Sequence, residues 1–114
     1  MRYRIGSRNH VALFEQHNGN LDEAGQPTYE TEADWIPIGF RWPCEMVATS
    51  GGEVVRGRQV TDRTTYVLFG EYFGSENVDA TCRVSVGGQV LYVAAVYDQT
   101  GWQMERRIEL KQER

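Results

Sequence analysis

The sequence predicts an all-β protein, a small antiparallel β-barrel of six or seven strands formed by one domain that spans residues 1–114. Short runs rich in β-branched and aromatic residues recur along the chain between turn residues. Residues 83–86 and 89–97 are two such runs, and Gly87-Gly88 between them supplies the positive φ of a two-residue hairpin turn. A barrel is favoured because closing a small sheet removes its exposed edges.

The N-terminal part of the chain predicts one strand followed by an exposed loop. Residues 1–8 are polar and basic, and we expect them to be a flexible N-terminus. Residues 10–17 alternate so that Ala12 and Phe14 share one face of a strand. Residues 18–27 are dense in Asn, Asp, Gly and Pro, which is typical of an exposed loop.

The next stretch predicts two strands. Acidic residues alternate with others along residues 28–35, so we expect a strand with one face in water. Pro37 and Pro43 bracket the following run, and proline cannot donate a hydrogen bond to a sheet ladder. We therefore expect residues 37–47 to lie at an edge of the sheet or to form a bulged strand.

Residues 49–63 are the one stretch that lacks the pattern of a strand. Ser50 and Glu53 fit a capping box, which predicts a short helix. Gly57 would cost such a helix about 1 kcal/mol, which favours a loop instead. The sequence leaves both alternatives open: the barrel carries either a long loop or a short-helix insertion here.

The C-terminal half predicts the remaining strands. Residues 61–73 read as a long strand, and Gly70 in its interior is typical of a bulge or a barrel corner. Residues 79–86 lead into the glycine hairpin, and residues 104–110 alternate again as the last strand. Together these segments complete an antiparallel meander.

Composition argues against two classes of partner. The formal net charge is −4. General nucleic-acid binding needs a basic footprint to neutralise phosphates, so the whole surface does not suit it. The sequence contains no run that approaches the ~20 apolar residues of a membrane span, and we expect no membrane partner.

The sequence contains no recognisable catalytic or cofactor-binding constellation. Cys44 and Cys82 are predicted to be free, buried thiols, and with His10 and His17 they lack the spacing of a zinc site. Residues 50–52 lack the following Lys and Ser/Thr of a phosphate-binding loop, and no nucleophile elbow is present. We therefore predict that the protein is not an enzyme and binds no metal or cofactor.

The aromatic residues allow two interpretations. Trp35, Phe40, Trp42 and Trp102 could form a platform on which bases stack. Such platforms are interleaved with lysines, and Lys111 is the only lysine of the chain. Core and interface packing is therefore the favoured interpretation.

Several loose motifs occur in an order that is familiar from one protein family. In chain order they are an arginine-rich start that runs into His10-Val11, Asp-x-x-Gly-x-Pro at residues 22–27, an acidic stretch that ends at Trp35, a second run with Trp42, Ser-Gly-x-Glu at residues 50–53, Arg56 and Gln59, Thr64-Thr65, the Gly87-Gly88 hairpin, Tyr92, and Val96-Tyr97-Asp98. Over residues 6–111 this order resembles the head–tail adaptor family of tailed bacteriophages. These are the head-closure or stopper proteins of long-tailed phages and prophages.

The resemblance implies a structural virion protein of the phage neck, assembled in the cytoplasm of the bacterial host. Such a subunit forms a homo-oligomeric ring with itself, typically of twelve copies. The portal and adaptor rings lie above it, and tail-terminator or tail proteins lie below. The ring closes the head and provides the channel for packaged double-stranded DNA, which passes without sequence-specific binding.

The resemblance also suggests which residues make contacts, and loops on a rigid scaffold are where function concentrates. A ring-contact or channel loop would comprise Ser50, Gly52, Glu53, Arg56, Arg58, Gln59 and Arg63. A second interface loop would comprise Asp22, Glu23 and Gln26. Two alternatives remain: a tail-terminator or another neck protein, and an independent β-barrel module that binds a peptide or nucleic acid through the Trp-rich edge near residues 35–42.

Overall fold

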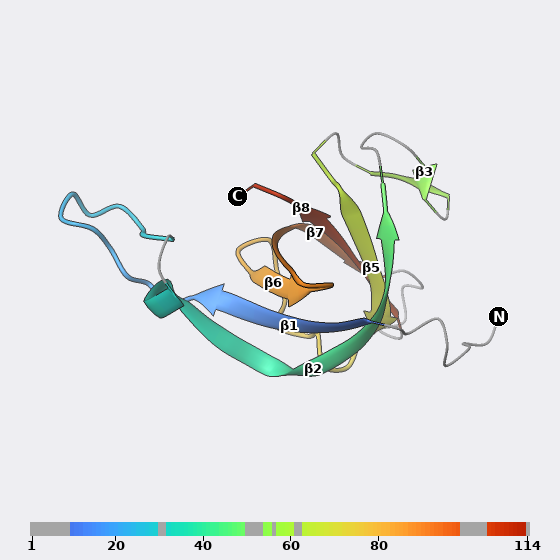
Figure 1. Ribbon diagram of the computed structural model, residues 1–114, viewed down its shortest axis with the longest axis horizontal. Coiled ribbons are helices and arrows are strands. Elements are labelled where there is room, and N and C mark those ends of the chain that lie inside the picture. The colour runs from blue at the N-terminus through green and yellow to red at the C-terminus, as the bar shows by residue number, and fades with distance from the viewer. Residues whose placement is uncertain are drawn as a thin grey trace.

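Six strands close into one antiparallel barrel, as the sequence predicts (Figure 1). The computed structural model describes residues 10–29, 32–49, 54–55, 57–60, 63–98 and 105–113, and of Phe40 and Arg58 it describes the backbone only. The barrel strands are β1 (His10–His17), β2 (Trp35–Ala48), β5 (Tyr66–Glu71), β6 (Arg83–Val86), β7 (Gln89–Asp98) and β8 (Glu105–Lys111). Around the barrel they follow the order β1-β2-β5-β8-β7-β6, and β6 pairs with β1 to close it.

The first two strands confirm the expected alternation and the effect of the prolines. Ala12 and Phe14 of β1 are buried in the core. β2 pairs with β1 along its first half and with β5 from Cys44 onward. Pro37 and Pro43 lie in the half that has β1 on one side only, where a missing N–H costs no ladder bond. A register shift between Ala12 and Phe14 supplies the expected bulge.

The strand predicted over residues 28–35 is wrong. Residues 30 and 31 lie outside the described residues, and Glu32–Asp34 forms a short 3-10 helix, η2, so that β2 begins at Trp35. The Asp34 side chain is buried and accepts hydrogen bonds from Thr28 Oγ1 at 2.7 Å and Asn20 Nδ2 at 3.2 Å. The Asp34 carboxylate therefore bonds to the preceding loop and does not lie on a solvent-exposed strand face.

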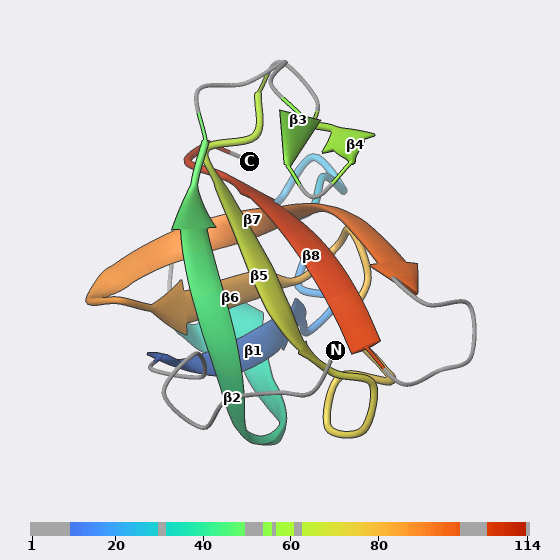
Figure 2. The same cartoon turned by 90° about the vertical axis from the view of Figure 1, so that its right-hand side faces the viewer.

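The helix considered for residues 49–63 is also wrong where the structure describes that stretch. Val54–Val55 (β3) and Arg58–Gln59 (β4) pair as a small hairpin, which forms a sheet separate from that of the barrel (Figure 2). Gly57 has φ +80°, a left-handed conformation that glycine adopts without strain and that ends a helix. Residues 50–53, which carry the capping-box pattern, lie outside the described residues.

The β3–β4 hairpin covers the outer face of the barrel over β5 and β8. Val60, after the hairpin, is buried with Val67 and Phe69 of β5, and Val55 packs against the same cluster. On β8, Arg107 and Glu109 point to this outer face and yet are 0% exposed. Arg107 Nη1 donates a hydrogen bond to the Val55 carbonyl oxygen at 2.6 Å. The hairpin is therefore fixed to the barrel by a buried arginine.

Gly70 does not form a bulge, one of the two roles that the sequence suggested for it. It pairs with Cys44 on one side and Arg106 on the other, in continuous register. A Cβ at this position would lie 2.3 Å from the indole of Trp42, which is buried and donates from Nε1 to the Glu71 carbonyl oxygen at 2.9 Å. The glycine is required because the tryptophan occupies the space over it.

The remaining strands predicted for the C-terminal half are confirmed with adjusted boundaries. β5 occupies the central part of residues 61–73, and β6 occupies only the C-terminal half of residues 79–86. Gly87 and Gly88 have φ +60° and +76°, and positive φ at both central positions is the requirement of a type I′ turn.

The cysteines and the described tryptophans belong to the interior of the protein. Cys44 and Cys82 are free and buried, and burial raises the pKa of the Cys82 thiol. Trp35 and Trp42 are buried as expected of core aromatics, whereas Trp102 lies outside the described residues.

Candidate functional surfaces

The predicted second interface loop is an arm that projects from one end of the barrel (Figure 1). The two sides of the arm are joined by an isolated β-bridge between Leu21 and Pro27. Asp22 Oδ1 accepts hydrogen bonds from the amides of Ala24 and Gln26, both at 2.9 Å, so Asp22 builds the turn at the tip. Glu23 and Gln26 are exposed there and are free to make contacts.

The base of the arm is tied to the barrel. The Asn18 amide donates to the Asp34 carbonyl oxygen at 2.8 Å, and His17 Nε2 bonds to the Thr28 carbonyl oxygen. Asn18 Nδ2 also donates to the carbonyl oxygen of Ala33. These bonds connect the end of β1, the arm and η2, so the arm leaves the barrel in a defined direction.

The described part of the predicted ring-contact loop lies at the other end of the molecule from the arm (Figure 1). Gln59 and Arg63 are exposed at the β3–β4 hairpin and after it. Arg58 belongs to β4, but its side chain is not described. Ser50, Gly52, Glu53 and Arg56 lie outside the described residues. The structure therefore does not bring the two predicted loops together.

An apolar row on the outside of the barrel is a feature that the sequence prediction did not single out. Val11 and Leu13 are each 45% exposed on β1, and Val90 on β7 is 47% exposed. Leu13 pairs with Ser85 of β6, which in turn pairs with Val90, so the row crosses three strands. We call Val11, Leu13 and Val90 the apolar stripe.

The β3–β4 hairpin presents another exposed apolar residue. Val54 of β3 is 67% exposed. In the barrel order, β1, which carries Val11 and Leu13, lies three positions from β8 and two from β5, the strands beneath the hairpin. β7, which carries Val90, is next to β8, so only the β1 part of the stripe lies across the barrel from the hairpin.

A cluster of fixed charge borders the stripe. Arg83 Nε lies 2.8 Å from Glu15 Oε1, and Arg83 Nη2 lies 3.0 Å from Glu32 Oε2. The guanidinium also covers the ring of Trp35 at 4.7 Å from its centroid. A shallow groove of about 240 Å³ runs between these charges and the side chains of Leu13 and Val90.

A larger pocket opens at the end of the barrel from which the arm leaves. It has a volume of about 540 Å³, and we call it the barrel-end pocket. It is lined by His17, Tyr29, Trp35, Ala80, Thr81, Cys82, Tyr92, Val93 and Lys111. These residues come from six separate segments of the chain, and for that reason no local motif predicts the pocket.

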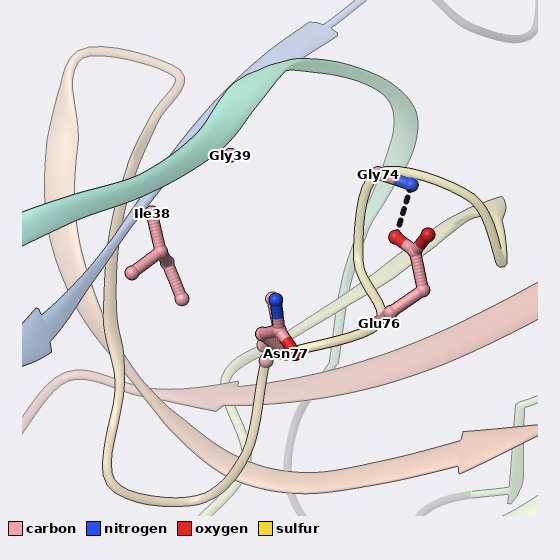
Figure 3. Close-up of a pocket in the computed structure, with 6 residues that line it drawn as sticks. Ile38, Gly39, Gly74, Glu76 and Asn77 are labelled. Atoms are coloured by element: carbon pink, nitrogen blue, oxygen red, sulfur yellow. Dashed lines mark hydrogen bonds between the residues drawn. The ribbon is translucent and has the colours of Figure 1, made fainter.

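A third pocket, between β2 and the turn that precedes β6, has a structural explanation (Figure 3). It holds about 290 Å³ and is lined by Ile38, Gly39, Gly74, Glu76, Asn77 and Val78. The Glu76 carboxylate accepts a hydrogen bond from the Gly74 amide, so its charge is used to close the turn. Among the described lining residues, Glu76 is the only ionisable group.

Within the described ranges, no three His, Cys, Asp or Glu side chains are grouped as metal ligands would be. No helix among the described residues has the length and apolar character needed to cross a membrane.

The fold defines a small closed antiparallel β-barrel that carries a projecting arm and a covering hairpin. No protein-family model matches the chain, and no curated protein matches it in sequence.

Proposed function

We propose that this protein is a structural subunit of the phage neck. Copies of it form a ring between the portal and adaptor rings and the tail, where the ring closes the head and provides the DNA channel. The observation that carries the proposal is the presence of two separate exposed apolar surfaces, the apolar stripe and Val54 of the β3–β4 hairpin. The order of motifs along the chain supports the assignment to the neck.

Two different surfaces on one subunit suit a ring because a head-to-tail contact between them repeats until it closes. In this contact the β3–β4 hairpin of one copy, with Val54 exposed, lies on the apolar stripe of the next copy. The six strands follow a closed order, and Pro37 and Pro43 lie in the half of β2 that is paired on one side only, so neighbouring copies meet through side chains and not by adding strands. A net charge of −4 on each subunit gives a channel wall that does not hold the DNA it conducts.

Replacing Leu13 with lysine is expected to abolish ring assembly on the portal–adaptor complex. A lysine in the centre of the stripe would be buried without a partner in the contact, which is costly. Since Leu13 is 45% exposed in the single subunit, we expect the free energy of unfolding to change by only about 0.5 kcal/mol. Light scattering of the variant mixed with the complex measures assembly.

Gln16→Lys is the matched control, because Gln16 is exposed on the same strand but is polar. Val54→Lys should also block assembly, from the other side of the contact. In a mixture of the two variants, the intact hairpin of a Leu13→Lys copy can still bind the intact stripe of a Val54→Lys copy. The mixture should therefore give dimers, detected by chemical cross-linking, but no rings. A Leu13→Lys variant that joins the complex as well as Gln16→Lys contradicts the proposed contact.

A second candidate function is an independent module that binds a ligand through the Trp-rich edge. Trp42 does not suit this function because it is buried beneath Gly70 and contacts the core. One observation favours Trp35 as a ligand-binding residue: it lines the barrel-end pocket. This function predicts a monomer that binds its ligand without the neck proteins.

A further inference from the structure

The barrel-end pocket has the size and position of a ligand site. Its volume of about 540 Å³ lies within the roughly 300–1,000 Å³ of small-molecule pockets. Residues at or next to the ends of β1, β2, β6 and β8 line it, together with Tyr29 at the base of the arm. The pocket is thus built on strand ends that the sheet hydrogen bonds hold in place.

Aromatic rings form one wall of the pocket. The ring centroids of Tyr29 and Trp35 are 6.0 Å apart, and those of Trp35 and Tyr92 are 6.2 Å apart. Trp35 is fixed by a hydrogen bond from Nε1 to the Tyr29 carbonyl oxygen at 3.0 Å and by the guanidinium of Arg83 on its ring. A wall of ordered rings favours a ligand with a flat ring of its own.

Most polar groups at the pocket already have partners. His17 Nε2 bonds to the Thr28 carbonyl oxygen, and its Nδ1 accepts from the Gly19 amide. The Thr81 hydroxyl donates to Asp79, whose pKa this bond lowers. These groups hold the rim of the pocket in shape and offer little to a ligand.

Two donors remain at the pocket. Lys111 of β8 and Tyr92 of β7 are cross-strand partners, and both line the cavity. Within the described part of the chain, neither the Lys111 ammonium nor the Tyr92 hydroxyl has a hydrogen-bond or ion-pair partner, and no carboxylate lines the pocket. A cation and a hydroxyl side by side favour an anionic acceptor.

We propose that the barrel-end pocket binds a planar aromatic compound that carries an acidic group. The ring lies against Tyr29, Trp35 and Tyr92, and the acidic group accepts hydrogen bonds from Lys111 and Tyr92. A mononucleotide and an aromatic carboxylic acid both have this chemistry. The described lining of the pocket comes from a single subunit, so the inference does not depend on ring formation.

Binding is tested by titrating the full-length protein with deoxyguanosine monophosphate and, separately, with indole-3-acetate, using calorimetry. We expect saturable binding of at least one of the two probes, and the probe that binds identifies the source of the ligand. Lys111→Met should weaken that binding about tenfold, as expected for loss of a charge-assisted hydrogen bond. Arg41→Met removes an exposed charge outside the pocket and should leave binding unchanged.

An uncharged analogue separates the role of the charge from a general loss of structure. Deoxyguanosine or indole-3-acetamide should lose much less affinity on Lys111→Met than the acidic probe does, because neither carries a negative charge to pair with the ammonium. Lys111 is the only lysine of the chain, so its acetylation is read directly by mass spectrometry, and the bound probe should slow it. Absence of saturable binding for both probes, or binding that neither depends on Lys111 nor protects it, overturns the proposal.

Discussion

Replacing Arg107 with methionine is expected to remove about 3–5 kcal/mol from the free energy of unfolding, the usual cost of breaking a buried ion pair. Arg107 Nε lies 3.3 Å from Glu109 Oε2, and both side chains are fully buried. Methionine fills much of the space but leaves the Glu109 carboxylate buried without its cation. Domain stabilities are about 5–15 kcal/mol, so the loss is a large fraction of the total. Urea unfolding followed by circular dichroism measures it.

Two further variants separate the charge effect from a loss of packing. The double variant Arg107→Met, Glu109→Leu removes both charges and should recover most of the stability. Lys111→Met lies on the same strand, but its ammonium is not fully buried, and we expect a change within about 0.5 kcal/mol. If Arg107→Met is as stable as Lys111→Met, the buried pair does not hold the hairpin to the barrel.

Replacing Gly70 with alanine is expected to cost about 1–3 kcal/mol of stability, the range for overpacking a core. The new Cβ would lie 2.3 Å from the Trp42 ring, far inside van der Waals contact. The indole cannot move away cheaply because it is buried and its Nε1 donates to the Glu71 carbonyl oxygen. Thermal and urea unfolding of the purified variant measure the loss.

A double-mutant cycle with Trp42→Phe identifies the cause. The smaller ring leaves room for the new methyl group, so Gly70→Ala should cost less in the Trp42→Phe background than in wild type. Equal costs in the two backgrounds would mean that the glycine serves the strand and not the tryptophan.

Much of the barrel could be predicted because its signals are local. The alternation along residues 10–17 needs only the period of a strand, and Gly87-Gly88 needs only the positive φ of a tight turn. The prolines of β2 correctly indicated a stretch that is paired on one side and bulged.

The errors arose where a distant contact decides the local structure. Asp34 alternates like a residue of a wet strand, yet it is buried because Thr28 and Asn20 bond to it. The position of Gly70 inside a strand suggested a bulge or a barrel corner. Its role is instead set by Trp42, which lies 28 positions earlier in the chain. No pattern of neighbours along the sequence contains that information.

The candidate sites differ in the same respect, because local sequence predicts one of them and distant contacts form the others. The arm at residues 18–27 was predicted from turn residues, and the structure confirms an exposed, turn-rich segment. The barrel-end pocket joins residues as distant as His17 and Lys111, and the apolar stripe depends on which strands are neighbours. Both emerge only from the closed order of the strands.

The most direct test of the proposed function is the mass of the protein by light scattering, alone and mixed with the portal–adaptor complex of the same phage or prophage. We expect the protein to join that complex at one copy per portal subunit and to fail when Leu13 is replaced by lysine. A protein that stays monomeric with every neighbouring neck and tail protein would contradict the proposal and favour an independent binding module.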